Sequence, residues 1–306
     1  MEQQPLVSVV VITYNSSKTI IETLDSIKAQ TYQNLELIIS DDCSKDKTVE
    51  IVEEWLNDNK NHFAHVELVT TDVNTGVAGN NNRGIAKSHG TWIKPIAGDD
   101  LLLPECISNN LSYIKTNEEV QAVFSRALFF GDPFLCKKYE NFGYGIFALS
   151  SRERYLTILT HNTIIAATAF ISRKYIDSVG GYNEEIPFLE DWPFWIKMFK
   201  EKNKIVFINR ETVKYRMGVS LSQGNGGRGK FDKSYELALS YAYECQMQEN
   251  PIYKIYAFLL KTQRKNKSLL YYWLLRINPY YYYYKYLGMK EKLASKRFNS
   301  YRNRLS

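Results

Sequence analysis

The sequence predicts an α/β protein with an open, mostly parallel β-sheet flanked by helices, followed by a helical C-terminal appendage. Three observations predict this class. Short β-branched runs alternate with segments of helical periodicity over the first hundred residues. Several of these runs end in polar residues, as strands of an open α/β sheet do where they meet a ligand. Residues 261–306 are basic and aromatic and lack the alternation.

The alternation can be followed along the chain. The predicted strands are residues 7–12, 35–40, 66–70 and 92–96. The first is a continuous β-branched run, typical of a strand buried on both faces. Ile20, Leu24 and Ile27 then recur at helical spacing. A second helix follows the second strand, and a polar, glycine-containing run at residues 74–84 leads into a third. The predicted order is βαβαβαβ.

Polar residues that suit a nucleotide follow three of these strands. Ligands of open α/β sheets bind beyond the carboxyl ends of the strands. A tyrosine offers a base a stacking face, and a carboxylate accepts a base N–H. The candidates are Thr13, Tyr14 and Asn15 after the first strand, Asp41 and Asp42 after the second, and Asp99 and Asp100 after the fourth. Core packing is the alternative for Tyr14, and helix capping is the alternative for Asp41 and Asp42.

The Asp99-Asp100 pair predicts a metal site. Adjacent carboxylates repel and raise each other's pKa unless a cation or a set of donors holds them. A hard divalent ion that carries phosphate oxygens is a common reason for such a pair. An Asp-rich turn before a helix that starts near Pro104 is the alternative.

A second pair of acids lies in the other half of the chain. That half is predicted to contain strands at residues 121–130 and 164–171 and an aromatic loop at residues 134–150. Glu190 and Asp191 then open an amphipathic helix, where the helix dipole favours carboxylates, so capping is one interpretation. The neighbouring aromatics Phe188, Trp192 and Trp195 would partly desolvate a carboxylate and raise its pKa toward that of a general base.

A glycine-rich segment separates the two predicted parts of the chain. Residues 220–230 contain four glycines and no apolar residue except Leu221, which predicts a mobile loop. The loop would serve either as a lid over a phosphate or as a linker. We therefore expect a first domain at residues 1–222 and an extension at residues 223–306.

The extension carries the positive charge of the chain. From residue 261 onward, twelve Lys and Arg stand against one acid, Glu291, a net charge of +11, so that residues 1–260 carry −5 of the total of +6. A partner attracted by the charge would bind there. An anionic membrane surface is the expected partner, because the extension also holds Leu269, Trp273 and a run of tyrosines. Packing of a helical appendage on the first domain is the alternative.

Composition excludes several classes of protein. The chain has 306 residues, 44% hydrophobic and 24% charged, which suits a buried core and not a disordered protein. Its four cysteines form no CxxC pair, so neither a zinc site nor a disulfide framework is predicted. Residues 7–12 follow no basic segment and are interpreted as a strand, not as a signal peptide. No stretch approaches 18 apolar residues, and a cytoplasmic location is expected.

Taken together, these residues resemble the family-2 inverting nucleotide-sugar glycosyltransferases, which have the Rossmann-like GT-A fold. The similarity runs from about residue 7 to residue 222. Each motif alone is weak, but six in the same order are specific. The motifs are VSVVVITYN (7–15), LELIISDDCSKDKT (35–48), the segment 74–90, GDD (98–100) with Pro104 after it, GGY (180–182) and EDW (190–192).

The resemblance implies a role for each candidate residue. The nucleotide would be held by Thr13, Tyr14, Asn15, Asp41, Asp42, Asn82 and Asp99. Asp99 and Asp100 would bind Mn²⁺ or Mg²⁺. Asp191 would deprotonate the acceptor, with Glu190 beside it. Two departures from the family pattern stand out: Ala97 replaces an additional Asp of the acidic turn, and Asn81-Asn82 replaces Arg-Asn, so that Arg83 or the glycine-rich loop would supply the missing cation.

The expected reaction follows from these roles. A sugar would pass from a nucleoside diphosphate, UDP first, to a hydroxyl of a glycan or lipid-linked acceptor, with inversion at the anomeric carbon. The process would be the synthesis of a cell-surface polysaccharide such as lipopolysaccharide or capsule, on the inner face of the membrane. The alternative is a non-catalytic nucleotide- or glycan-binding module on the same fold. No nucleic-acid partner is expected.

Overall fold

The computed structural model describes residues 4–115, 119–139, 142–201, 204–218, 228–249, 251–266 and 269–302. The chain forms two compact units, each built from segments that are separate in the sequence. The first unit comprises Met1–Glu140, Ile165–Glu190 and Asn203–Phe231. The second comprises Asn141–Ile164, Asp191–Lys202 and Asp232–Ser306. The expected boundary at residue 222 and most of the predicted glycine-rich loop lie outside the described residues.

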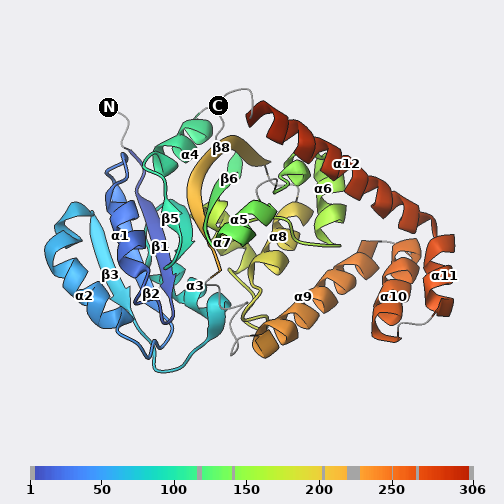
Figure 1. Ribbon diagram of the computed structural model, residues 1–306, viewed down its shortest axis with the longest axis horizontal. Coiled ribbons are helices and arrows are strands. Elements are labelled where there is room, and N and C mark those ends of the chain that lie inside the picture. The colour runs from blue at the N-terminus through green and yellow to red at the C-terminus, as the bar shows by residue number, and fades with distance from the viewer. Residues whose placement is uncertain are drawn as a thin grey trace. The chain divides into compact units, whose positions relative to one another are not determined.

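The first unit is built on a mixed β-sheet (Figure 1). The strands are β1 Val7–Thr13, β2 Leu35–Asp41, β3 His65–Val69, β4 Trp92–Ala97, β5 Leu101–Leu102, β6 Val120–Gly131, β7 Phe170–Ser172 and β8 Lys204–Met217. Across the described residues their order is β3-β2-β1-β4-β7-β6-β8-β5. β1 to β4 are parallel, β7 is antiparallel to β4 and β6, β6 and β8 are parallel, and β5 is antiparallel to β8.

The central strands form because β-branched residues fill both faces of the sheet. In β1, Val7, Val9, Val10 and Val11 are fully buried. The strand pairs on both sides, with β2 and with β4. The helices of this unit are α1 Ile20–Lys28, α2 Thr48–Asn59, α3 Gly76–Lys87, α4 Cys106–Lys115, α5 Pro133–Tyr139 and α7 Arg173–Val179. α3 packs on β1 and β2. The predicted βαβαβαβ order is confirmed.

The prediction of one aromatic loop over residues 134–150 is wrong in part, because two helical elements interrupt it. α5 occupies its first part, and the 3₁₀ helix η2, Gly145–Ala148, lies near its end. The carboxylate of Asp132 accepts a hydrogen bond from Leu135 N at 2.9 Å, as a helix N-cap does, and Pro133 takes the first helical position. The Asp-Pro pair was the helix signal.

Two further elements differ from the prediction because buried polar side chains bind the backbone. The strand expected at residues 164–171 is reduced to β7, preceded by the 3₁₀ turn η3, Ala166–Thr168. The ammonium of the fully buried Lys94 donates to the carbonyls of Ala167 and Ala169 and so takes acceptors that a strand would use. α3 begins at Gly76, inside the polar run, because Asp42 accepts that residue's N–H.

The second unit is helical. Its helices are α6 Ser151–Ile158, α8 Asp191–Lys200, α9 Arg228–Glu249, α10 Pro251–Asn266, α11 Leu269–Ile277 and α12 Pro279–Arg302. Ser150 and Glu153 form a capping box at the start of α6. Trp192 Nε1 on α8 donates to the Ile158 carbonyl at 2.7 Å and joins the two helices.

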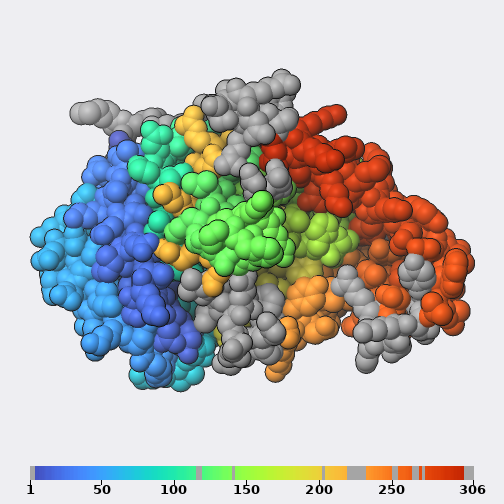
Figure 2. Space-filling view, in the orientation of Figure 1, coloured from blue at the N-terminus to red at the C-terminus, as the bar shows by residue number. Residues whose placement is uncertain are grey.

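The predicted C-terminal helical appendage is confirmed. The helices α10, α11 and α12 follow one another along the chain and carry the orange-to-red colours at the right of Figure 2. Within the described part of the chain, no helix combines the length and the apolar character needed to cross a membrane.

Candidate functional site

The carboxyl ends of the parallel strands bring polar loops together at one edge of the sheet. The register pairs Thr13, at the end of β1, with Asp41, at the end of β2. Gly98, directly after β4, donates its N–H to the Ile12 carbonyl of β1 at 2.9 Å. The loops after β1, β2 and β4 are therefore neighbours, as the sequence predicts for a ligand site.

Asp41 joins the first two loops. Its carboxylate is 2% exposed and accepts hydrogen bonds from Thr13 Oγ1 at 2.7 Å and Ser44 N at 2.8 Å. Asn15 N donates to Ser44 Oγ at 2.8 Å. Asn15 and Cys43 have φ angles of 54° and 67°, and they are the non-glycine residues with positive φ in the described part of the chain. Such backbone strain is concentrated at ligand-binding sites.

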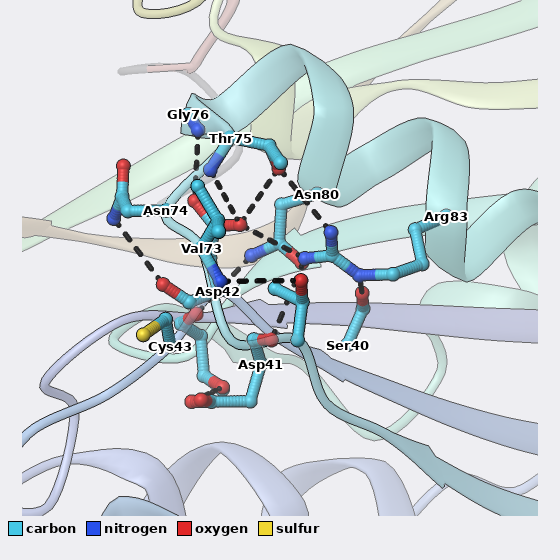
Figure 3. A network of polar contacts seen from close by, with 12 residues as sticks. Ser40, Asp41, Asp42, Cys43, Val73, Asn74, Thr75, Gly76, Asn80 and Arg83 are labelled. Carbon is cyan, nitrogen blue, oxygen red and sulfur yellow. Dashed lines mark hydrogen bonds and ion pairs between the residues drawn. The ribbon is translucent and has the colours of Figure 1, made fainter.

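Asp42 fixes the loop after β3 (Figure 3). Its Oδ1 accepts from Thr75 N at 3.0 Å, Thr75 Oγ1 at 2.7 Å and Arg83 Nη2 at 2.9 Å. Its Oδ2 accepts from Gly76 N at 2.8 Å. Protein donors thus occupy both oxygens of a side chain that is 2% exposed. Asp42 holds the loop, the start of α3 and Arg83 in place.

We expect Asp42→Asn to destabilise the protein and to weaken binding of the nucleotide that the sequence predicts, UDP, equally in Mn²⁺ and in EDTA. The NH₂ group of an asparagine cannot accept the hydrogen bonds that the carboxylate accepts. The loss costs about 1–3 kcal/mol of folding free energy. Chemical denaturation and calorimetric titration with UDP measure the two effects. Asp72→Asn makes the same charge change at an exposed position and serves as the control. A loss of UDP affinity confined to samples with Mn²⁺ would contradict this role.

Contacts with Arg216 and Thr23 hold the turn after β4. Asp100 is 3% exposed, and its Oδ1 accepts a hydrogen bond from Arg216 N of β8 at 2.8 Å. Arg216 Nε donates to the Asp99 carbonyl at 2.8 Å, and Thr23 Oγ1 donates to the Asp100 carbonyl at 2.9 Å. The half-buried Asp99 is the more accessible of the two acids.

The electrostatics of this turn fit a divalent cation. Burial raises the pKa of Asp99, against the opposing charge of Arg216. Burial and the neighbouring Asp99 charge raise the pKa of Asp100 well above its ordinary value. Two adjacent carboxyls, one buried and one half-buried, that resist ionisation are relieved by a bound cation. Their oxygen atoms are the ligands that Mg²⁺ and Mn²⁺ prefer.

Asp191 begins α8 in the second unit. Its Oδ2 accepts a hydrogen bond from Asn162 Nδ2 at 2.8 Å. Burial raises the pKa of Asp191 to about 6, and hydrogen bonds from Asn162 and the backbone of Trp192 limit the rise. Trp192 and Trp195 are buried and supply the aromatic surroundings that the sequence predicts. A carboxylate with a pKa near neutrality suits a general base.

The other predicted residues occupy different positions. Tyr14 is half-buried and Asn15 exposed in the loop after β1, and Glu190 is the half-buried last residue of its segment of the first unit. Asn82 holds a different turn: its amide donates to the Tyr182 carbonyl at 2.9 Å and to Glu184 at 2.8 Å, and accepts from Tyr182 N at 2.9 Å. The structure thus ties Asn82 to the Gly-Gly-Tyr motif.

Sequence reasoning missed three residues of these sites. Arg216 binds the acidic turn through its backbone and its guanidinium, and Asn162 binds Asp191. Neither position carries a local signal, because each contact joins distant segments. Lys94, fully buried in β4, did carry one, since a lysine within an apolar strand must find acceptors.

Comparisons with known proteins agree on one family. The family model described as Glycosyl transferase family 2 matches residues 8–180, more than half of the chain. An uncharacterized glycosyltransferase of Haemophilus influenzae is 28% identical over 220 residues, covering 71% of this chain and 82% of the relative. The Escherichia coli UDP-Glc:alpha-D-GlcNAc-diphosphoundecaprenol beta-1,3-glucosyltransferase WfaP is 27% identical over 214 residues, covering 69% and 77%.

Solved structures agree on the fold. Staphylococcus aureus TarS 1–349 in complex with UDP-GlcNAc superposes with a TM-score of 0.60 at 20% identity, covering 77% of this chain and 66% of that TarS chain. The mannosyltransferase PcManGT of Pyrobaculum calidifontis, in complex with GDP-Man and Mn²⁺, gives 0.58 at 18% identity, covering 97% and 88%. These likenesses confirm the expected GT-A fold.

Proposed function

Because the chain belongs to glycosyl transferase family 2, we propose that it transfers a sugar from a nucleoside diphosphate, UDP first, to a hydroxyl of a glycan or lipid-linked acceptor, with inversion. The Asp99-Asp100 turn carries the proposal, because its raised carboxyl pKa values fit a cation site at the nucleotide edge of the sheet. WfaP, named for transfer from UDP-Glc to a diphosphoundecaprenol-linked GlcNAc, supports a lipid-linked acceptor. A role in cell-surface polysaccharide synthesis is part of the proposal.

The roles follow from the contacts of each side chain. The loops that carry Thr13, Tyr14 and Asn15, held by Asp41 and Asp42, bind the nucleoside. Asp99 and Asp100 hold Mn²⁺ or Mg²⁺, which when bound supplies positive charge against the leaving diphosphate. The Mn²⁺ in the PcManGT complex supports this assignment.

Asp191 is the proposed general base. Its carboxylate takes the proton of the attacking hydroxyl while the hydroxyl oxygen bonds to the anomeric carbon. The bond from that carbon to the diphosphate oxygen breaks, and its electron pair leaves with the diphosphate. A pKa of about 6 leaves Asp191 mostly ionised at neutral pH and still basic enough to accept the proton. Glu190 stands beside it in the chain.

A donor panel tests the proposal. UDP-glucose, UDP-N-acetylglucosamine and GDP-mannose are incubated with the protein in Mn²⁺ or in EDTA, and nucleotide release is measured. We expect release from a UDP-sugar that requires the metal. Binding of UDP without turnover of any donor, even with lipid-linked acceptors, would instead favour the non-catalytic binding module.

We also propose that α11 docks on an anionic membrane surface. Leu269, Leu270, Trp273 and Ile277 are 76%, 64%, 59% and 76% exposed, and their spacing places them on one face of the helix. The helices before and after α11 carry exposed basic residues, among them Lys254, Lys261, Lys285, Lys292 and Lys296. An exposed apolar face in a basic segment suits anionic headgroups. α12, in contrast, packs against η2 and α6, as the alternative of a packed appendage expects.

Co-sedimentation with vesicles tests this docking. Full-length protein is expected to bind vesicles of anionic phospholipid at low salt and to be released as salt rises, because each engaged Lys or Arg contributes about 1 kcal/mol. The double variant Leu270→Glu with Trp273→Glu should bind about tenfold more weakly or worse. Tyr113→Glu changes a 45% exposed residue of α4 and is the control. Equal binding by all three proteins would reject α11 as the docking face.

A further inference from the structure

The only acid in the basic C-terminal segment is buried. Glu291 on α12 is 6% exposed, although twelve Lys and Arg lie between residue 261 and the end of the chain. A buried carboxylate is costly unless donors satisfy it. Its partners therefore indicate what Glu291 does.

Both oxygens of Glu291 bind one short turn of the second unit. His161 Nε2 donates to Oε2 at 3.1 Å, and Thr163 Oγ1 donates to Oε1 at 3.0 Å. His161 is also held from its other side, because its Nδ1 lies 2.7 Å from Thr160 Oγ1. The carboxylate thus fixes the turn on both sides of Asn162.

Asn162, between these two contacts, is the residue that binds Asp191. Its Nδ2 donates to Asp191 Oδ2 at 2.8 Å, and its Oδ1 accepts from Ile164 N at 3.0 Å. Because the backbone N–H of Ile164 needs an acceptor, the amide is oriented with its NH₂ toward Asp191. The position of this donor depends on the path of the turn.

α12 is itself held at the level of Glu291. Ser295 Oγ donates to the Glu291 carbonyl at 2.9 Å and accepts from Gly145 N at 2.9 Å. Gly145 has no room for a side chain, since a Cβ there would collide with the Glu291 carbonyl. The helix therefore offers a fixed support for the turn.

We propose that Glu291 is a positioning residue, which holds the turn at residues 160–163 so that Asn162 presents its amide to Asp191. The inference rests on the proposed role of Asp191 as general base. Under it, α12 contributes to the reaction through Glu291 alone, and the C-terminal extension serves the reaction in addition to its proposed membrane contact. The titratable groups of this contact are His161 and Glu291, and the Lys290–Glu153 ion pair next to it joins α12 to α6.

The test compares Asn162→Ala, Glu291→Gln and the control Lys290→Gln. Lys290 is the neighbour of Glu291, and its ammonium donates to Glu153 at 2.6 Å and not to the turn at residues 160–163. The measurements are UDP affinity, kcat for UDP release from UDP-glucose or UDP-N-acetylglucosamine, and the titration of the Asp191 carboxyl by ¹³C NMR, assigned by its loss in Asp191→Asn. Thermal unfolding checks that each variant is folded.

Asn162→Ala is expected to lower kcat about 10- to 100-fold, the cost of a hydrogen bond to a charged group, at unchanged UDP affinity. It should also move the Asp191 titration upward, because a donor to the carboxylate is lost. Glu291→Gln should change kcat and the titration in the same directions by a smaller factor, and Lys290→Gln should change neither.

Two outcomes separate this inference from the proposed function. Wild-type kcat and an unmoved Asp191 titration in Glu291→Gln, with Asn162→Ala impaired, would overturn the role of Glu291 and leave the base assignment standing. Full activity of Asp191→Asn would remove the base assignment, while the NMR titration would still decide whether Glu291 controls Asn162. If Glu291→Gln does not fold, Thr163→Val, which removes one contact of the same turn, replaces it.

Discussion

Asp191→Asn is expected to lose transfer by about 10²–10⁴-fold, the usual contribution of a general base, while UDP binding stays at the wild-type level. An amide has no basic oxygen to take the proton of the acceptor hydroxyl. Initial rates with the donor identified in the panel, and calorimetric titration with UDP, measure the two quantities. Glu190→Gln, one residue away, is the matched control and should lose less. Wild-type kcat in Asp191→Asn would reject the assignment.

The pKa of Asp191 adds a pH dependence to this prediction. The base must be ionised, so kcat/KM of the wild type should rise with pH through about 6 and then level off. Burial raises the folded-state pKa above the value of an unfolded Asp, about 3.9. Ionisation of Asp191 therefore opposes folding. Its cost in folding free energy is present at pH values above the pKa of the unfolded-state carboxyl. Asp191→Asn should accordingly be at least as stable as the wild type at neutral pH and above. Thermal unfolding of both proteins at pH 5, 7 and 8 checks this.

The first four strands and three helices were predictable because their signals are local. A run such as VSVVVI is buried on both faces wherever it lies in a parallel sheet, and Ile20, Leu24 and Ile27 show the helical period within nine residues. The elements predicted wrongly depend on single buried polar groups. Lys94 and Asp42 bind backbone groups far along the chain, and no local pattern shows which groups these are.

The division into two units was not predictable for the same reason. The second unit combines the segments 141–164, 191–202 and 232–306, which meet only in the folded chain. The candidate site divides similarly. Adjacent carboxylates at a strand end are conspicuous in a sequence, whereas Arg216 and Asn162 are of types common on any protein surface. Their roles arise from contacts across 116 and 29 residues.

Asp99→Asn is expected to weaken UDP binding in Mn²⁺ by about tenfold or more, the effect of losing more than ~1.4 kcal/mol of charge interaction with the ion, and to leave binding in EDTA unchanged. Asp100→Asn should show the same metal dependence with a smaller loss, because its carboxylate is the less accessible of the two and already accepts Arg216 N. Calorimetric titration of UDP under both conditions measures the effect. The reverse order of the two losses would make Asp100 the principal ligand.

The stability of these variants tests the metal assignment independently of UDP. Burial raises the folded-state pKa of both carboxyls, so their ionisation opposes folding at neutral pH when no cation is present. A bound divalent ion reverses this, and Mn²⁺ should raise the unfolding temperature of the wild type. Asp99→Asn removes one of two adjacent buried charges, so in EDTA it should be at least as stable as the wild type, and added Mn²⁺ should leave its unfolding temperature unchanged. A wild type that gains no stability from Mn²⁺ would show that the turn binds no such ion, and its two acids would then serve to hold Arg216 and the end of β8.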